Sequence, residues 1–185
     1  SEGGAVWLDA ELTSPYQFYQ FWLNVDDEGV EDYIKIYTLF NQEQIAAIIA
    51  DFNADKSARA AQKALAFEVT KLVHGSARAE SVKRISEVLF AARDYKELTT
   101  PDFEELGREL GVFEASAGVE LAGALVDAGL ATSKGEARRF LESNAIYING
   151  SQIPLGKTTL DLDDAINGYI VLRRGKNAQV IIFLR

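Results

Sequence analysis

The stretch TSKGEARRFLESNAIYING, residues 132–150, contains the change of periodicity that decides the fold of the second half of the chain. Ser133 followed three residues later by Glu136 is the pattern of a capping box, which predicts a helix start at this point. Further on, AIYING alternates apolar and polar residues as a strand does, and it ends in Asn-Gly, a strong signal for a tight turn. The stretch therefore predicts a short helix followed by a strand.

Similar signals flank this stretch. VELAGALVDAGL, residues 119–130, has the pattern of a second short helix, and the last 18 residues, GYIVLRRGKNAQVIIFLR, predict a hairpin. The hairpin strands are rich in β-branched residues, with the turn at residues 175–177. We expect residues 117–185 to form a small α+β module, within the size range that folds alone.

The first half of the chain has helical periodicity almost throughout residues 15–92. Ser14 is a suitable N-cap, and Pro15 suits the first helical position, where its missing N–H would be unpaired in any case. Five such segments without a convincing strand predict an all-α domain at residues 1–97. Residues 98–116 are interpreted as a linker with a short helix. The connection itself is expected near GVFEASAG, residues 111–118.

Composition describes a globular protein without a membrane span. The 185 residues carry a net charge of −9, with no cysteine and one histidine, His74, so disulfides are excluded and a metal site is improbable. No apolar run approaches the roughly 20 residues of a spanning helix, and a cytoplasmic location is the default expectation. The charge is uneven: residues 1–115 hold 11 Lys and Arg against 21 Asp and Glu, and residues 116–185 hold 8 against 7.

Cations gather at two places in the predicted α+β module. In the helix after Ser133, three apolar residues fall on one side, and Lys134, Arg138 and Arg139 cover an adjoining arc with Gly135, where a backbone can approach closely. The second group lies at the hairpin turn. Exposed cations on a helix are ordinary, so this pattern alone is weak evidence for a phosphate-binding surface. The apolar residues, expected to be buried, are Ala137, Phe140 and Leu141.

The order of these parts resembles the α-L RNA-binding module, in which the second helix and a nearby loop contact structured RNA. The module is shared by a small-subunit ribosomal protein, pseudouridine synthases and bacterial tyrosyl-tRNA synthetases. Carried onto this sequence, the resemblance implies an RNA-binding set composed of Ser133, Lys134, Gly135, Arg138, Arg139, Asn149, Arg173, Arg174, Lys176 and Asn177.

Further segments resemble bacterial tyrosyl-tRNA synthetases in the right order. They are EGGAVWLD at 2–9, TSPYQFYQFWLN at 13–24, VTKLVHG at 69–75, NAIYING at 144–150 and LRRGKN at 172–177. This resemblance implies a helical anticodon-binding domain followed by the α-L module, together holding the anticodon stem-loop and variable arm of tyrosine tRNA. Ser1 is interpreted as the last residue of the family's signature loop or a cloning remnant.

The resemblance also implies what this chain lacks. ATP, with Mg²⁺, and tyrosine are expected to bind a catalytic domain outside these residues, so the 185 residues alone are expected to be inactive and without a cofactor or catalytic residue. The family's dimer contact is expected in that catalytic domain too. We therefore expect the chain to be a monomer and the full-length enzyme a homodimer.

Two other functions stay open on the sequence. The chain could be a stand-alone RNA-binding protein of the α-L type that acts on other structured RNA, or its helical half could be a protein-interaction domain. The aromatic residues of segment 16–22, the acidic run at 26–32 and His74 are better explained by packing, by helix-dipole effects and by a helix end than by a binding or catalytic site.

Overall fold

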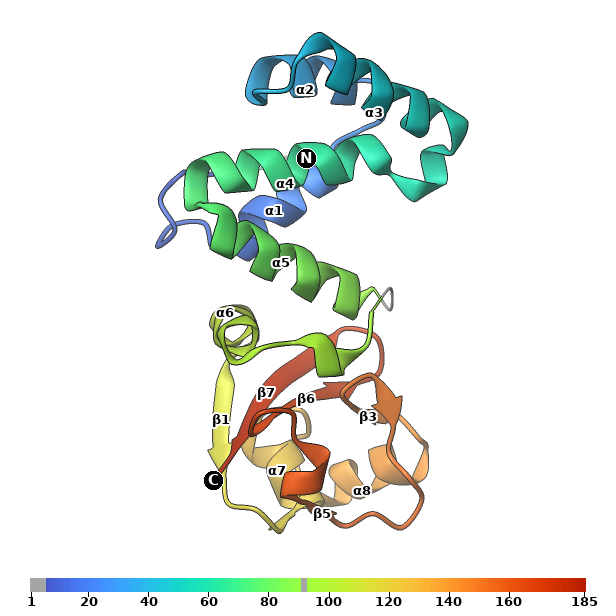
Figure 1. Ribbon diagram of the computed structural model, residues 1–185. Helices are drawn as coiled ribbons and strands as arrows, with labels where there is room; N and C mark the ends of the chain where they lie inside the picture. Colours follow the sequence, from blue (N-terminus) through green and yellow to red (C-terminus); the bar gives the residue numbers. More distant parts are fainter. Residues whose placement is uncertain (1–5, 91–92) are drawn as a thin grey trace. The chain divides into compact units, whose positions relative to one another are not determined.

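The computed structural model describes residues 6–90 and 93–185, and the chain divides into two compact units, residues 1–83 and 84–185. The first half of the segment EGGAVWLD, residues 2–5, and Ser1 before it lie outside the described residues. The predicted all-α domain followed by a small α+β module is confirmed (Figure 1). The division between the compact units falls before the predicted domain boundary at residues 97 and 98.

The first unit is built from helices that pack around α4. Ser14 caps α1 by accepting a hydrogen bond from the Gln17 amide at 3.1 Å, and Asn41 and Gln44 form a reciprocal capping box at the start of α3. The helices are α1 (Pro15–Leu23), α2 (Val30–Tyr37), α3 (Gln42–Ala54), the 3₁₀ turn η1 (Lys56–Ala58), α4 (Ala60–His74) and the first part of α5 (Ser76–Leu89).

The core of this unit takes one apolar stripe from each helix. Phe18, Ile34 and Leu65 are fully buried where α1, α2 and α4 meet. His74 is the last residue of α4 and Gly75 follows with φ 87°, so the interpretation of His74 as a helix end is confirmed. Of the aromatic segment in α1, Phe18 and Tyr19 are buried, but Phe21 is exposed, so packing explains only part of it.

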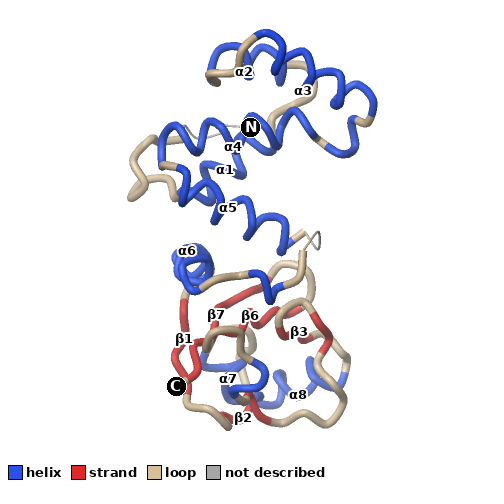
Figure 2. The backbone as a smooth tube through the Cα atoms, viewed as in Figure 1, coloured by secondary structure: helices blue, strands red, loops and turns tan. Residues whose placement is uncertain are grey.

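The second unit combines helices with a five-stranded sheet of order β1-β7-β6-β3-β4 (Figure 2). β1 lies parallel to β7, and the other pairs are antiparallel, while β2 and β5 form a separate pair. The elements are η2 (Tyr95–Glu97), α6 (Thr100–Leu110), β1 (Val112–Ala115), β2 (Val119–Glu120), α7 (Leu121–Asp127), α8 (Lys134–Glu142), β3 (Ile146–Ile148), β4 (Ser151–Gln152), β5 (Thr159–Leu160), η3 (Leu162–Asp164), β6 (Tyr169–Arg174) and β7 (Ala178–Leu184).

Side chains alternate between the two faces of a strand, and each face of this sheet packs against a different helix. Ile170 and Leu172 of β6 are fully buried in the core that includes Leu121 and Leu125 of α7. On the opposite face, the ring of Tyr169 stacks on Phe103 of α6, with centroids 5.0 Å apart. The predicted hairpin at the end of the chain is confirmed, since β6 pairs over its whole length with residues 178–183 of β7 around the turn at 175–177.

Residues 111–118, predicted as the connection between domains, are part of the second unit. Strand β1 pairs with β7 from Val112 with Ile181 to Ala115 with Leu184. The sequence prediction interpreted the glycines and alanines here as the connection between domains, but the edge of β7 offers a row of backbone partners that only the folded hairpin creates. The segment is therefore an edge strand, and α6 belongs to the same unit.

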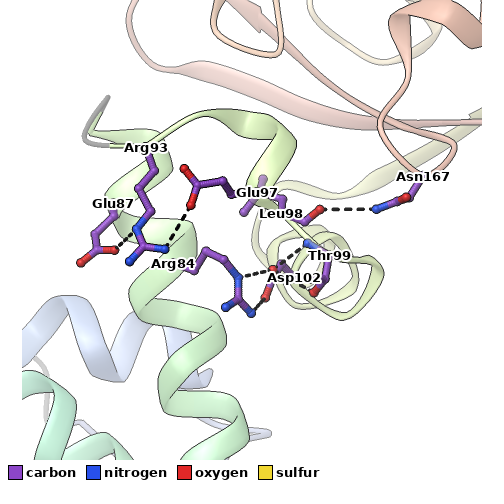
Figure 3. A network of polar contacts seen from close by, with 8 residues as sticks. All are labelled: Arg84, Glu87, Arg93, Glu97, Leu98, Thr99, Asp102 and Asn167. Atoms are coloured by element: carbon purple, nitrogen blue, oxygen red, sulfur yellow. Dashed lines mark hydrogen bonds and ion pairs between the residues drawn. The ribbon is translucent and has the colours of Figure 1, made fainter.

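A polar network fixes the segment that leads into α6 (Figure 3). The fully buried carboxylate of Asp102 accepts two hydrogen bonds from the Arg84 guanidinium, at 2.7 and 3.0 Å, and further bonds from the Thr99 amide and hydroxyl. A buried carboxylate is tolerated only when it is paired and hydrogen-bonded in this way. The network ties the end of α5 to the start of α6, where the sequence predicted a linker.

Candidate nucleic-acid interface

Helix α8 begins where the sequence predicted, at Ser133, whose hydroxyl accepts a hydrogen bond from the Glu136 amide at 3.2 Å. The predicted capping box between Ser133 and Glu136 forms only in half, because the Glu136 side chain does not bond to the Ser133 amide. The Glu136 carboxylate accepts from the amide and hydroxyl of Thr132, at 2.6 and 2.7 Å, rather than from Ser133. These bonds hold the pKa of Glu136 below its usual value, so a negative charge stays at the helix start, where the helix dipole favours it.

The buried face of α8 is narrower than predicted. Ala137 is fully buried, but Phe140 and Leu141 are only partly buried against the core of the second unit. α8 therefore buries less of its apolar face than the 7-residue α7, which buries four residues in the same core. The long side chains on either side cover the edge of the core instead.

The predicted cations of α8, Lys134, Arg138 and Arg139, are all exposed, and two of them share an acidic partner. The Lys134 Nζ atom lies 2.5 Å from the Glu120 carboxylate, and an Arg138 Nη atom lies 3.7 Å from it. The hydrogen bond from Lys134 is the main cause that lowers the pKa of Glu120. Gly135 lies in the first turn of α8 and is exposed, with the Ser133 hydroxyl oxygen nearest to the position of an added Cβ.

The cations of the hairpin are held by aromatic rings. The Arg173 guanidinium lies 3.9 Å from the centre of the Tyr147 ring, and Arg174 lies 5.0 Å from the centre of the Phe140 ring. Arg174 also donates to the Leu130 carbonyl at 2.8 Å, so it joins the hairpin to α8 and to the loop before it. Arg174 thus lies on the side of the sheet that faces α8, whereas Arg173, the neighbouring residue of β6, lies on the opposite face with Tyr147. Lys176 and Asn177 are exposed in the turn.

Asn149, another predicted site residue, has its side chain engaged in the fold. Its amide nitrogen donates to the Asp164 carbonyl, and its amide oxygen accepts from the Val171 amide, both at 2.8 Å. Its φ of 46° is in the left-handed region, which Asn tolerates better than most residues and which an Asn-Gly turn requires. The hydrogen bonds and the backbone conformation of Asn149 therefore stabilise the turn between β3 and β4.

Sequence reasoning missed two residues that the structure places at this surface. Glu120 lies 14 residues before its partner Lys134, and no local pattern connects positions so far apart. Tyr147 was predicted only as part of the strand AIYING, but it pairs across β3 and β6 with Arg173 and supports the guanidinium. A cross-strand aromatic–arginine pair would have been predictable had the register of the sheet been known.

Within residues 6–90 and 93–185, no group of three or more His, Cys, Asp or Glu side chains is placed to hold a metal ion. In the same part of the chain, no helix has the length and apolar character to cross a membrane.

Comparison with known proteins defines the class of the chain. Residues 1–91 match the family of class I tRNA synthetases (W and Y), and residues 102–182 match the Tyrosine--tRNA ligase SYY-like C-terminal domain. The two matches cover nearly the whole chain, in the order expected of an aminoacyl-tRNA synthetase. The chain belongs to the tyrosine–tRNA ligase family.

Individual relatives are similar over almost all of this chain. The tyrosine–tRNA ligase of Geobacillus kaustophilus is 42% identical over 98% of the chain, and that of Neisseria meningitidis (strain FAM18) is 44% identical over 98%. The chain spans less than half of their length, 44% and 45% respectively. A C-terminally truncated mitochondrial tyrosyl-tRNA synthetase of Aspergillus nidulans is 37% identical, with a TM-score of 0.45 over 47% of this chain and 24% of that chain.

Proposed function

We propose that this chain is the tRNA-recognition part of a tyrosine–tRNA ligase and binds tyrosine tRNA. The observation that carries the proposal is the group of exposed cations on α8, with Arg174 of the hairpin held against the same helix, in a unit that matches the family's C-terminal domain. The first unit carries most of the negative charge, so RNA phosphates are attracted mainly to the second unit. The relatives' shared name favours this reading over a stand-alone protein that acts on other RNA.

The proposed binding surface consists of α8 and the hairpin turn. Lys134, Arg138 and Arg139 are exposed, so they can reach phosphates, and their contribution is position more than sequence reading. Arg173 and Arg174 are held by Tyr147 and Phe140. A guanidinium that is already oriented loses less freedom when it binds a phosphate. The Asn149 side chain supports this surface from within the fold.

The proposal also assigns a part of the tRNA to each unit. We assign the anticodon stem-loop to the helical unit and the variable arm to the second unit, following the resemblance to bacterial tyrosyl-tRNA synthetases. ATP-dependent attachment of tyrosine belongs to the longer protein, as does homodimer formation, and this chain alone binds without catalysing. A cytoplasmic location follows from the same proposal, because bacterial tRNA is aminoacylated there.

Replacing Arg138 tests the proposed surface. The Arg138→Ala chain is expected to bind a tyrosine-tRNA transcript about tenfold more weakly at low salt. The slope of log K against log salt should fall by about 1, because one phosphate contact releases fewer counterions. Fluorescence anisotropy with labelled tRNA at several salt concentrations measures both quantities. A thermal melt should be nearly unchanged, since the side chain is exposed.

Arg108 of α6 provides the matched control. It is an exposed arginine of the same unit, paired with Glu105 at 3.5 Å and outside the proposed surface. Arg108→Ala should leave affinity and salt slope at the wild-type values. Equal behaviour of the two variants would show that general charge, not the α8 surface, attracts the RNA, and the proposed surface would be wrong.

A further inference from the structure

The sequence contains two Asn-Gly pairs, Asn149–Gly150 and Asn167–Gly168. In such a pair the backbone nitrogen of the glycine can attack the asparagine side chain with little obstruction, because glycine has no side chain of its own. Both asparagines have positive φ, 46° and 53°, and the glycines after them have φ of 80° and 85°. The two pairs thus share their sequence and nearly share their backbone conformation, so their surroundings decide how they differ.

Asn149 is held by three hydrogen bonds. Its side-chain nitrogen donates to the Asp164 carbonyl and its side-chain oxygen accepts from the Val171 amide, both at 2.8 Å. Its own backbone amide donates to the Val171 carbonyl at 2.9 Å. Because both ends of the side-chain amide are bonded, its carbon can turn toward the Gly150 nitrogen only after these bonds open.

Asn167 is exposed and much less constrained (Figure 3). It lies in a two-residue turn, where Ile166 and Tyr169 exchange backbone hydrogen bonds at 2.8 and 2.9 Å. In the described part of the chain, its side chain makes one hydrogen bond, a long one of 3.4 Å from its nitrogen to the Leu98 carbonyl. Rotation of this side chain toward the Gly168 nitrogen therefore breaks a single weak bond.

We propose that Asn167 is a site of spontaneous deamidation in the folded chain and that Asn149 is protected from this reaction. The Gly168 nitrogen loses its proton to hydroxide and attacks the Asn167 Cγ atom. A new C–N bond closes a succinimide ring, and the bond from Cγ to the side-chain nitrogen breaks and releases ammonia. Water then opens the ring at either carbonyl to give aspartate or isoaspartate, so the net change consumes one water and releases one ammonia.

The product changes the turn in two ways. A carboxylate has no proton to donate at neutral pH, so the hydrogen bond to the Leu98 carbonyl is lost and two acceptors face each other. Isoaspartate also routes the main chain through the side chain, which lengthens a turn whose Gly168 carbonyl accepts from the Leu184 amide at 2.8 Å. Deamidation therefore weakens the attachment of the segment before α6 to the turn before β6.

Peptide mapping of the wild-type chain tests the proposal. The folded chain is incubated in mildly alkaline buffer, digested with trypsin and analysed by tandem mass spectrometry, with a sample taken before incubation to correct for deamidation during digestion. Cleavage at Arg139, Lys157 and Arg173 places the two pairs in different peptides, 140–157 and 158–173. Asn167 should deamidate about tenfold faster than Asn149, the ratio expected when two fewer hydrogen bonds have to open.

Two controls separate the effect of the fold from that of the sequence. In denaturant, Asn149 and Asn167 should react at similar rates, because the hydrogen bonds that distinguish them are gone. The Asn167→Gln chain keeps a side-chain amide but would have to close a larger ring. Its peptide 158–173 should stay unmodified, whereas Asn149 should keep its wild-type rate.

Three results would overturn the proposal. Equal rates at the two sites of the folded chain, or a faster reaction at Asn149, would show that the hydrogen bonds do not protect it. The same preference for Asn167 in denaturant would mean that neighbouring residues in the sequence, not the fold, cause it. An unmodified Asn167 in the folded chain, with reaction in denaturant, would show that its turn is protective as well. None of these measurements involves tRNA, so they leave the proposed function untouched.

Discussion

At the scale of single residues, two cations of α8, Lys134 and Arg138, are already paired with a carboxylate that would compete with an RNA phosphate. Glu120 is the residue before α7, yet its side chain makes no cap hydrogen bond there and instead contacts Lys134 and Arg138. An RNA phosphate that binds these two cations has to displace the Glu120 carboxylate. We infer that Glu120 weakens phosphate binding and raises the demand for several contacts at once.

Glu120→Gln is therefore expected to strengthen tRNA binding. The change removes a charge but no cap, and the affinity for the tyrosine-tRNA transcript at low salt should rise about threefold, the size expected for one exposed charge. Glu114→Gln is the control, because Glu114 is an exposed acid of β1 that pairs with Arg185 instead. Weaker binding by the Glu120→Gln chain would mean that Glu120 orients Lys134 for RNA rather than competing with it.

Residue identities also explain why the site could be predicted only in part. Ser133, Lys134, Arg138 and Arg139 follow from a local pattern, so their exposure and the helix start were predictable. The role of Asn149 was not, since its amide bridges Asp164 and Val171, which are 15 and 22 residues away. Positions related only through the folded sheet carry no local signal.

At the scale of elements, the start of α8 depends on a carboxylate that accepts two hydrogen bonds from Thr132. The pKa of Glu136 is lowered in the folded chain, so its charged form stabilises the fold above the unfolded pKa, near 4.5. This contribution disappears as the pH falls through the lower folded value. The element that presents the cations is thus stabilised at neutral pH and loses this support in acid.

Glu136→Gln tests this contribution. The melting temperature of the variant should be a few degrees below that of the wild type at pH 7, and the difference should shrink below about pH 4.5, where the wild-type carboxyl becomes protonated. Glu142→Gln, at the other end of α8, should show no such loss, because an acid is unfavourable near a helix C-terminus. A melting difference that is constant from pH 3 to pH 7 would contradict the role of the charge.

The helices and strands themselves were more predictable from the sequence than the way in which they pair and pack. The helices of the first unit and the final hairpin follow from caps and periodicity, as at Ser14, Asn41 and the turn after Arg174. Strand β1 was missed because four residues next to glycine are too few to show a periodic pattern, and pairing with β7 decides their conformation. The same pairing brings α6 into the second unit instead of a linker.

At the scale of the whole molecule, charge is unevenly distributed: residues 1–83 hold 7 Lys and Arg against 13 Asp and Glu, and residues 84–185 hold 12 against 15. The surplus of acids lies within residues 1–115, whereas the α8 cations and the arginines held by aromatic rings lie within residues 116–185, which hold 8 Lys and Arg against 7 Asp and Glu. The net charge of −9 therefore hides a local surface suited to phosphates. The overall average would have argued against an RNA partner.

The most direct test of this account is an NMR titration of the whole chain with the tyrosine-tRNA transcript at low salt, followed through backbone amides. We predict that signals of residues 133–142 and 172–179 shift or broaden first, and that added salt restores them, because these segments carry the proposed phosphate contacts. Changes confined to residues 6–83, with α8 and the hairpin unaffected, would contradict the account.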